Sequence, residues 1–253
     1  MPTIMIFDTE TTSVTEKKFC YNVGYTIFDT DTRAVICTKD YVVEQCWHNN
    51  ALFATAYYAD KRPIYVAAMR SRKATLDKWG YIMRSMAHDI REYKVEAAYA
   101  YNSPFDDEVF TFNCDWYKTL NPLDTIPVYD ICGMVSEYVT NTADYRLFCE
   151  QYERFTDTGN YSGTAETVYQ YLTGNPFFIE EHTALADAII ETEILSHCLD
   201  LGAEIGKEYK VVRILPRYNA KPVIIKVDGE VIYKGFYKKK TTSRETVHYK
   251  TEV

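Results

Sequence analysis

The sequence predicts an α/β fold in which a mixed β-sheet is flanked by helices. First, the run Ile4–Phe7 consists of apolar strand formers, and apolar side chains on both faces indicate a strand that is covered on both sides. Second, two further strand-like runs follow it after short turns, as in a meander. Third, helical and strand patterns alternate from about residue 76 onward, which is typical of a sheet with helices packed on its faces.

The expected strands are runs of β-branched and aromatic residues bounded by turn residues. After the first strand, residues 19–28 form the second. The turn at Asp29–Thr32 then leads into a returning strand at 34–37 and 41–43. Two later strands are expected at 95–101 and 127–130.

The expected helices rest on apolar periodicity and on start and stop signals. Between residues 76 and 90, apolar side chains recur at spacings of 3, 4, 3 and 4, which gives one stripe. Pro104 followed by acidic residues marks another helix start. The basic stretch 61–73 is expected to be a loop. Further helices are expected at 49–58, at 145–155 (carrying Tyr145, Phe148, Tyr152 and Phe155), at 164–172 and at 184–201.

The composition is that of an ordinary globular protein, with 253 residues, 47% hydrophobic and 25% charged. No apolar stretch approaches membrane-spanning length and no signal peptide is visible, so we expect a cytoplasmic protein with no membrane partner. The seven cysteines are scattered without a Cys-x-x-Cys pair, which favours reduced thiols over disulfides or a zinc site.

Charge is distributed unevenly along the chain. The net charge is −8, yet residues 205–253 carry 12 Lys/Arg against 5 Asp/Glu. The same stretch contains a hairpin pattern, with strands at 223–227 and 230–233 around Asp228–Gly229. We therefore expect a domain at 1–204 and a basic β-rich extension at 205–253. The extension would contact a nucleic-acid backbone or a protein partner, or it would be an unrelated solvated end.

The first strand ends in two carboxylates, Asp8 and Glu10, which a period of two places on one face. Such a pair is costly without a cation, and Mg²⁺ or Mn²⁺ prefers hard oxygen ligands. An isolated Asp-x-Glu is more often a solvated strand end, so the interpretation depends on partners elsewhere in the chain.

Two later segments offer such partners. Asp106 lies where the strand at 95–101 gives way to a helix. In the third segment, Thr183 is a suitable helix N-cap, which would leave His182 just outside the helix and Asp187 in its first turns. A histidine on this lead-in loop can reach a site that Asp187 completes.

These segments, Phe7–Thr12, Tyr101–Asp106 and His182–Ala188, resemble in order the three motifs of the DnaQ-like DEDDh 3'–5' exonucleases. This ribonuclease-H-like family includes the proofreading subunit of bacterial replicative DNA polymerase, and the resemblance spans roughly residues 3–200. Thr183 excludes the sibling branch that has a tyrosine there. Tyr101 departs from the histidine common in the family, and neither residues 46–72 nor the tail after 205 match it.

The resemblance implies two Mg²⁺ or Mn²⁺ ions, held by Asp8, Glu10, Asp106 and Asp187. His182 would be the general base that accepts a proton from the attacking water. The substrate would be the 3' end of single-stranded nucleic acid, with DNA favoured and RNA possible, and the product a nucleoside 5'-monophosphate. The residues expected to bind the substrate are Thr9, Thr11, Asn102 and Phe105.

Three alternatives remain open at this stage. Plain core packing is an equal interpretation of Phe105. A catalytically inactive module that binds nucleic acid or protein is disfavoured because all four acids and the histidine are present. Another ribonuclease-H-like enzyme, such as an endonuclease, is disfavoured by the His-x4-Asp spacing.

Overall fold

The computed structural model describes residues 2–13, 17–212, 220–227 and 230–238, and the chain divides into two compact units. The larger unit joins Met1–Thr142 to Gly163–Val212, and the smaller joins Ala143–Ser162 to Arg213–Val253. The predicted domain boundary at residue 205 therefore falls inside the larger unit. The N–H of Gly206 donates to the Tyr99 hydroxyl over 2.8 Å, which helps to hold this stretch on the larger unit.

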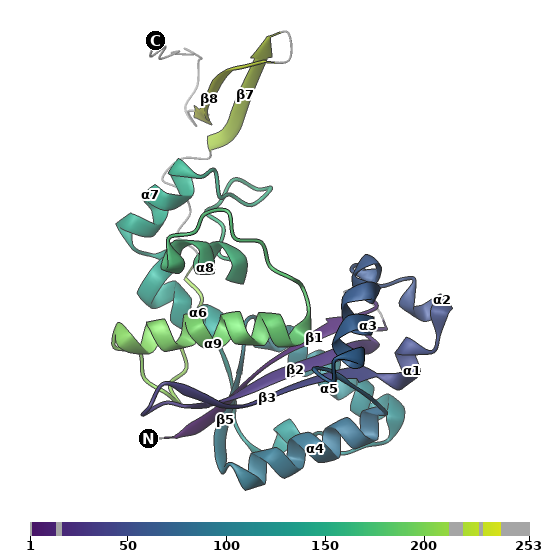
Figure 1. Ribbon diagram of the computed structural model, residues 1–253. Coiled ribbons are helices and arrows are strands. Elements are labelled where there is room, and N and C mark those ends of the chain that lie inside the picture. The colour runs from purple at the N-terminus through teal and green to yellow at the C-terminus, as the bar shows by residue number, and fades with distance from the viewer. Residues whose placement is uncertain (1, 14–16, 213–219, 228–229, 239–253) are drawn as a thin grey trace. The chain divides into compact units, whose positions relative to one another are not determined.

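A mixed sheet forms the centre of the larger unit, as predicted, and it has six strands, one more than the five expected (Figure 1). Its order is β4-β3-β2-β1-β5-β6. The meander β1–β2–β3 is antiparallel, whereas β5 joins β1, β6 joins β5 and β4 joins β3 in parallel. The strands are β1 Thr3–Thr11, β2 Cys20–Asp29, β3 Ala34–Val43, β4 Thr75–Asp77, β5 Val95–Ala100 and β6 Val128–Asp130.

Helices cover both faces of this sheet. In Figure 1, α9 crosses one face and α4 lies on the opposite side. The helices and helical turns of the larger unit are α1 Glu44–Trp47, α2 Asn50–Phe53, η1 Ala59–Lys61, α3 Arg62–Arg70, α4 Trp79–Glu92, α5 Ser103–Tyr117, η2 Pro122–Thr125, α6 Ile131–Val135, the π-helical turn η3 Ser136–Thr140, α8 Ala165–Thr173 and α9 Ala184–Asp200.

The two faces of strand β1 have different surroundings near its carboxyl end. Met5 and Phe7 pack into the main core with Trp79 of α4. Because side chains alternate along a strand, Asp8 and Glu10 point to the other face, which α9 contacts. One face of β1 therefore supplies stability and the other supplies carboxylates.

Helix α9 begins directly against β2. A β-carbon built at Gly24 would overlap the backbone of Ala184 and Leu185, so only glycine allows this approach. The expected cap by Thr183 is wrong in its detail: Thr183 occupies the N-cap position, but its side chain makes no capping hydrogen bond. Instead, Asn22 Oδ1 accepts from the N–H of Ala184 over 2.8 Å.

Further along α9, the hydroxyls of Thr26 and Thr192 lie 2.6 Å apart, a second polar contact between β2 and the helix. Since Asp8 pairs with Gly24 across the β1–β2 ladder, these contacts set the start of α9 above Asp8.

Three further sequence expectations about the larger unit were wrong. The basic stretch predicted as a loop contains helix α3, which has Pro63 in its first turn. Leu76 belongs to β4 rather than to the following helix, because it pairs with Val42 of β3. The predicted helix at 49–58 is only the single turn α2, and α1 lies before it.

The smaller unit contains α7 Ala143–Gln151 and an antiparallel hairpin of β7 Ala220–Val227 with β8 Glu230–Lys238. Helix α7 ends before Tyr152 and Phe155, which were expected to extend it. The pairing of the predicted hairpin is confirmed. Its turn, Asp228–Gly229, lies outside the described residues, as do Lys239 and Lys240.

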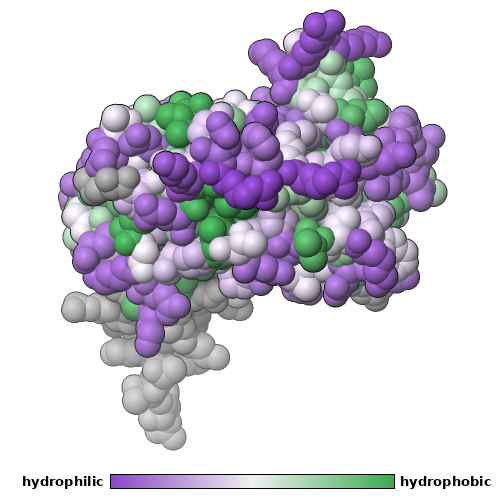
Figure 2. Space-filling model, turned by 90° about the horizontal axis from the view of Figure 1, so that it is seen from below, coloured by the Kyte–Doolittle hydropathy of each residue, from purple (hydrophilic) through white to green (hydrophobic). Residues whose placement is uncertain are grey.

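Polar side chains dominate the face shown in Figure 2, where hydrophobic residues form small separate patches. Along the described part of the chain, no helix combines the length and hydropathy that a membrane span requires.

The close contact at Gly24 yields a stability prediction. Gly24→Ala should lower the free energy of unfolding by about 3 kcal/mol, because the added methyl must displace the backbone at the start of α9. Urea denaturation measures this. Gly163→Ala is the matched control: a β-carbon there meets nothing within 4 Å, so its effect should stay within about 1 kcal/mol. Equal effects of the two substitutions would contradict the packing described for α9.

Candidate active site

Three carboxylates from two distant segments meet above the sheet. Asp8 and Glu10 come from β1 and Asp187 from the first turns of α9, and one ligand oxygen of each lies within 4.8 Å of the others. The structure thus brings together three of the four predicted metal ligands.

Asp106, the fourth, lies in the first turn of α5 and is only 3% exposed. It is not among the three mutually close carboxylates, but its charge raises the pKa of Asp8. The hydroxyl of Thr9 donates to Asp106 Oδ1 over 2.6 Å and fixes that carboxylate beside the group. Thr9, which was predicted to bind substrate, therefore orients Asp106, a predicted metal ligand.

Burial and mutual repulsion raise the pKa values of these carboxyl groups. Burial is the largest cause in each case, and neighbouring carboxylates add to it. The pKa of Asp8 rises well above its usual value. The pKa rises to about 10 for Glu10, to about 8 for Asp187 and to about 7 for Asp106.

The residues fit a hard divalent cation. Among the described residues, Asp187 Oδ1 is buried without a hydrogen-bond partner, which is costly unless something pairs with it. A cation beside Asp8 and Glu10 would pair with that oxygen and would also lower the raised pKa values. All-oxygen donors match the preference of Mg²⁺ and Mn²⁺.

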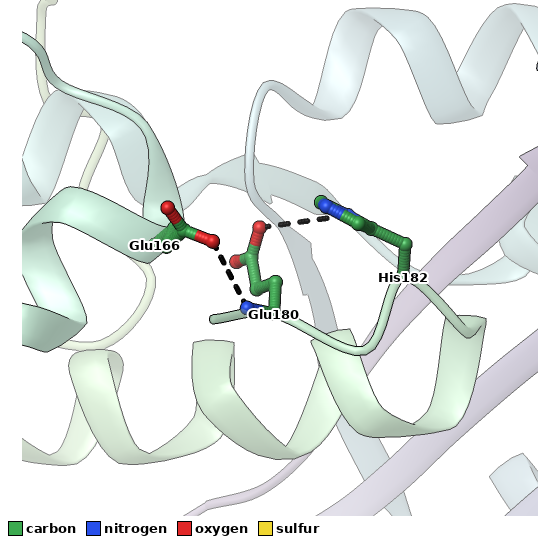
Figure 3. A group of neighbouring side chains, drawn as sticks. All are labelled: Glu166, Glu180 and His182. Carbon is green, nitrogen blue, oxygen red and sulfur yellow. Dashed lines mark hydrogen bonds and ion pairs between the residues drawn. The ribbon is translucent and has the colours of Figure 1, made fainter. Parts of the chain in front are cut away.

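His182 lies on the loop immediately before α9, as the sequence predicted. Its Nδ1 lies 3.7 Å from Glu180 Oε2, and Figure 3 shows the ring turned toward that carboxyl group. Glu166 of α8 accepts from the backbone N–H of Glu180 over 2.9 Å and so fixes the loop. Burial, followed by the charge of Lys61, lowers the pKa of His182 below its usual value.

Sequence reasoning missed two acids of this site. Glu191 is 3% exposed on α9 and accepts from the N–H of Tyr101 over 3.2 Å. Burial and the charge of Asp8 raise its pKa. Its spacing of four from Asp187, which places both on one helical face, could have revealed it. Glu180, whose pKa burial raises to about 8, lies in a loop without such a signal.

The other residues predicted to bind substrate have varied surroundings. The Thr11 hydroxyl donates to the Ser13 carbonyl over 3.0 Å. Asn102 has a left-handed φ of 64°. Phe105 packs against the main core, with Lys18 Nζ 4.6 Å from its ring centroid. Contact of these residues with substrate stays a prediction.

The raised pKa of Asp187 predicts a pH dependence of stability in chelator. The value is about 8 in the fold and about 3.9 in an unfolded chain. The stabilisation from its protonation is therefore complete below about pH 4 and is lost as pH rises to about 8. Asp187→Asn cannot ionise, so between these pH values it should gain a few kcal/mol relative to wild type.

Urea denaturation at several pH values measures this difference. Asp115→Asn, an exposed carboxylate on α5, is the matched control. Parallel stability curves for wild type and Asp187→Asn would contradict the description of this carboxylate.

Comparison with known proteins supports the fold. No protein-family model and no curated protein matches the sequence. The nuclease domain of 3'hExo, a DEDDh family member bound to rAMP, aligns with 79% of this chain and 93% of its own, at a TM-score of 0.50 and 11% identity. E. coli exonuclease I in complex with a dT13 oligonucleotide aligns at a TM-score of 0.48 and 14% identity, over 78% of this chain and 41% of its own. The chain therefore shares the fold of the 3'hExo nuclease domain, a ribonuclease-H-like mixed sheet flanked by helices.

Proposed function

We propose that this protein is a metal-dependent 3'–5' exonuclease that hydrolyses terminal phosphodiester bonds of single-stranded nucleic acid. The observation that carries the proposal is the convergence of Asp8, Glu10 and Asp187, with Asp106 beside them and one buried oxygen of Asp187 without a partner. A stable fold gains nothing from such a group unless cations bind it.

The four carboxylates would hold two divalent cations, Mg²⁺ or Mn²⁺. When bound, the cations supply positive charge that offsets the carboxylates and the negative charge developing on the phosphate. Thr9 keeps Asp106 in place through its hydrogen bond. Glu191, whose pKa is raised by burial and by the charge of Asp8, accepts a hydrogen bond from the backbone N–H of Tyr101.

His182 would take the proton of the attacking water. Its Nδ1 faces Glu180, which leaves Nε2 as the acceptor. Burial lowers the pKa of the ring, which favours the neutral form that a base requires. The oxygen of water bonds to phosphorus, the bond to the 3' oxygen breaks, and that oxygen takes a proton from solvent. The products are a strand shortened by one nucleotide, which ends in a 3'-hydroxyl, and a nucleoside 5'-monophosphate.

The substrate class is proposed as single-stranded DNA, with RNA possible. The rAMP in the similar 3'hExo domain is a nucleoside monophosphate, the class of product proposed here. We also propose that the basic stretch after residue 205 contacts the nucleic-acid backbone or a protein partner, because 12 of its residues are Lys or Arg.

The alternative is an inactive module that uses the same fold only for binding. It leaves unexplained why the acids are buried together, because buried carboxylates that repel one another destabilise a fold. A test of activity separates the two.

With Mg²⁺ or Mn²⁺, the purified protein should shorten a 5'-labelled single-stranded oligonucleotide stepwise and release nucleoside 5'-monophosphates. Excess chelator should stop the reaction, because the carboxylates would then lack cations. Gel sizing over time measures this, with a closed single-stranded circle as the control for endonuclease activity. Hydrolysis that persists in chelator, or equal rates on the circle, would refute the proposal.

Substitutions should separate the metal ligands from the base. His182→Ala should lower kcat by about 10² to 10⁴-fold, because only proton transfer is lost. It should still show the increase in Tm that Mn²⁺ gives wild type. Asp8→Ala should lose both activity and this increase. Thermal denaturation with and without Mn²⁺ measures binding independently of turnover. Near-wild-type kcat in His182→Ala would show that another group accepts the proton.

A further inference from the structure

The segment between β3 and β4, Glu44–Ala74, forms a compact structure of its own beside the sheet, which we call the β3–β4 segment. Its aromatic residues pack with residues of the adjoining sheet in a second core cluster. The ring of Tyr21 on β2 lies 5.1 Å from that of Phe53 and 5.9 Å from that of Tyr65, both edge-on. The cluster comprises Phe19, Tyr21, Val42, Cys46, Trp47, Phe53, Ala56, Tyr65 and Ala74.

Arg62 ties the parts of this segment together. Its guanidinium donates to Asn50 Oδ1 over 2.9 Å and to the carbonyl of Trp47 over 3.2 Å. The same group lies 4.7 Å from the centroid of the Trp47 ring. The start of α3 is therefore fixed to α1 and α2, and the turn between α2 and α3 is held at both ends.

That turn carries Tyr58, which reaches the candidate active site. The ring of Tyr58 stacks on His182, with the centroids 4.4 Å apart and the planes inclined by 10°. The positive charge of nearby Lys61 acts to lower the pKa of both His182 and Asp187. The β3–β4 segment therefore borders the site directly.

His182 needs such support because its own helix does not hold it. Its φ of 55° is a left-handed conformation that non-glycine residues adopt only where surrounding contacts maintain it. It precedes the N-cap of α9, and its side chain is 28% exposed. Tyr58 covers one face of the ring, and Glu180 lies at its Nδ1 edge.

We propose that Tyr58 is a positioning residue, which holds the His182 ring so that Nδ1 faces Glu180 and Nε2 stays directed to the attacking water. The β3–β4 segment is the rigid support for that ring. The inference rests on the proposed function of His182 as the base. It assigns a role to a part of the chain that the motifs at Asp8, Asp106 and Asp187 leave unexplained.

The kinetic test compares removal of the ring with removal of its hydroxyl. Tyr58→Leu should lower kcat by about 10 to 100-fold with little change in KM, because a displaced base impairs the chemical step. Tyr58→Phe keeps the stacked ring and should retain kcat within about threefold. Tyr81→Leu removes an aromatic ring that is 56% exposed on α4 and is the matched control. If Tyr58→Leu melts at a lower temperature than wild type, Tyr58→Gln provides a second variant that lacks the ring.

A spectroscopic test on the metal-free protein needs no activity. In protein with ¹³C-labelled histidine, the stacked Tyr58 ring should shift the His182 ring protons upfield, and His182→Asn identifies these signals among the five histidines. The shift should persist in Tyr58→Phe and disappear in Tyr58→Leu.

The outcomes separate the two proposals. Unchanged His182 signals in Tyr58→Leu, or an unchanged kcat in that variant of an active enzyme, would overturn the role of Tyr58 alone. Wild-type protein that hydrolyses no oligonucleotide would overturn the proposed function and this role with it. Loss of both the shift and kcat, with recovery in Tyr58→Phe, would support the inference.

Discussion

The crowding of carboxyl groups between β1 and α9 is the constraint on which the rest of the structure depends. Asp8, Glu10 and Asp187 lie close enough to share an ion, although the charge of Asp8 raises the pKa of both Glu10 and Asp187. This repulsion would push α9 away from β1 unless other contacts held the helix against the sheet. Gly24 and Asn22 do this: Gly24 lets the backbone of β2 contact the start of α9, and the Asn22 side chain accepts a hydrogen bond from the N–H of Ala184.

The two faces of the sheet therefore differ in the kind of packing that holds their helices. On the face with α4 and α5, the rings of Phe7, Trp79 and Phe110 pack together in the main core, with Phe7 edge-on to Phe110. On the face with α9, buried polar groups such as Asn22 and Thr26 give up some hydrophobic stabilisation and define one position of the helix. A site with strict geometry is thus supported by a core that tolerates more variation.

Local sequence patterns were enough to predict most of the fold and the residues of the three motifs. The strands of the meander and α9 could be predicted because their periodicity and end signals agree. Helix α3 could not, since its basic residues suggested a loop and its apolar contacts lie on a neighbouring segment. The cap by Asn22, the carboxyl of Glu180 and the ring of Tyr58 all act across large sequence separations, which no local pattern encodes.

The distance in sequence between Asp8 and Asp187 has a consequence for synthesis in the cell. Strand β1 leaves the ribosome first, whereas its partners on α9 follow almost a whole domain later. At about 5–20 residues per second, translation separates the two by roughly 10–40 seconds. During that interval the nascent chain holds two acids of the site without the third. The group of three carboxylates can therefore form only after nearly all of the larger unit has been synthesised.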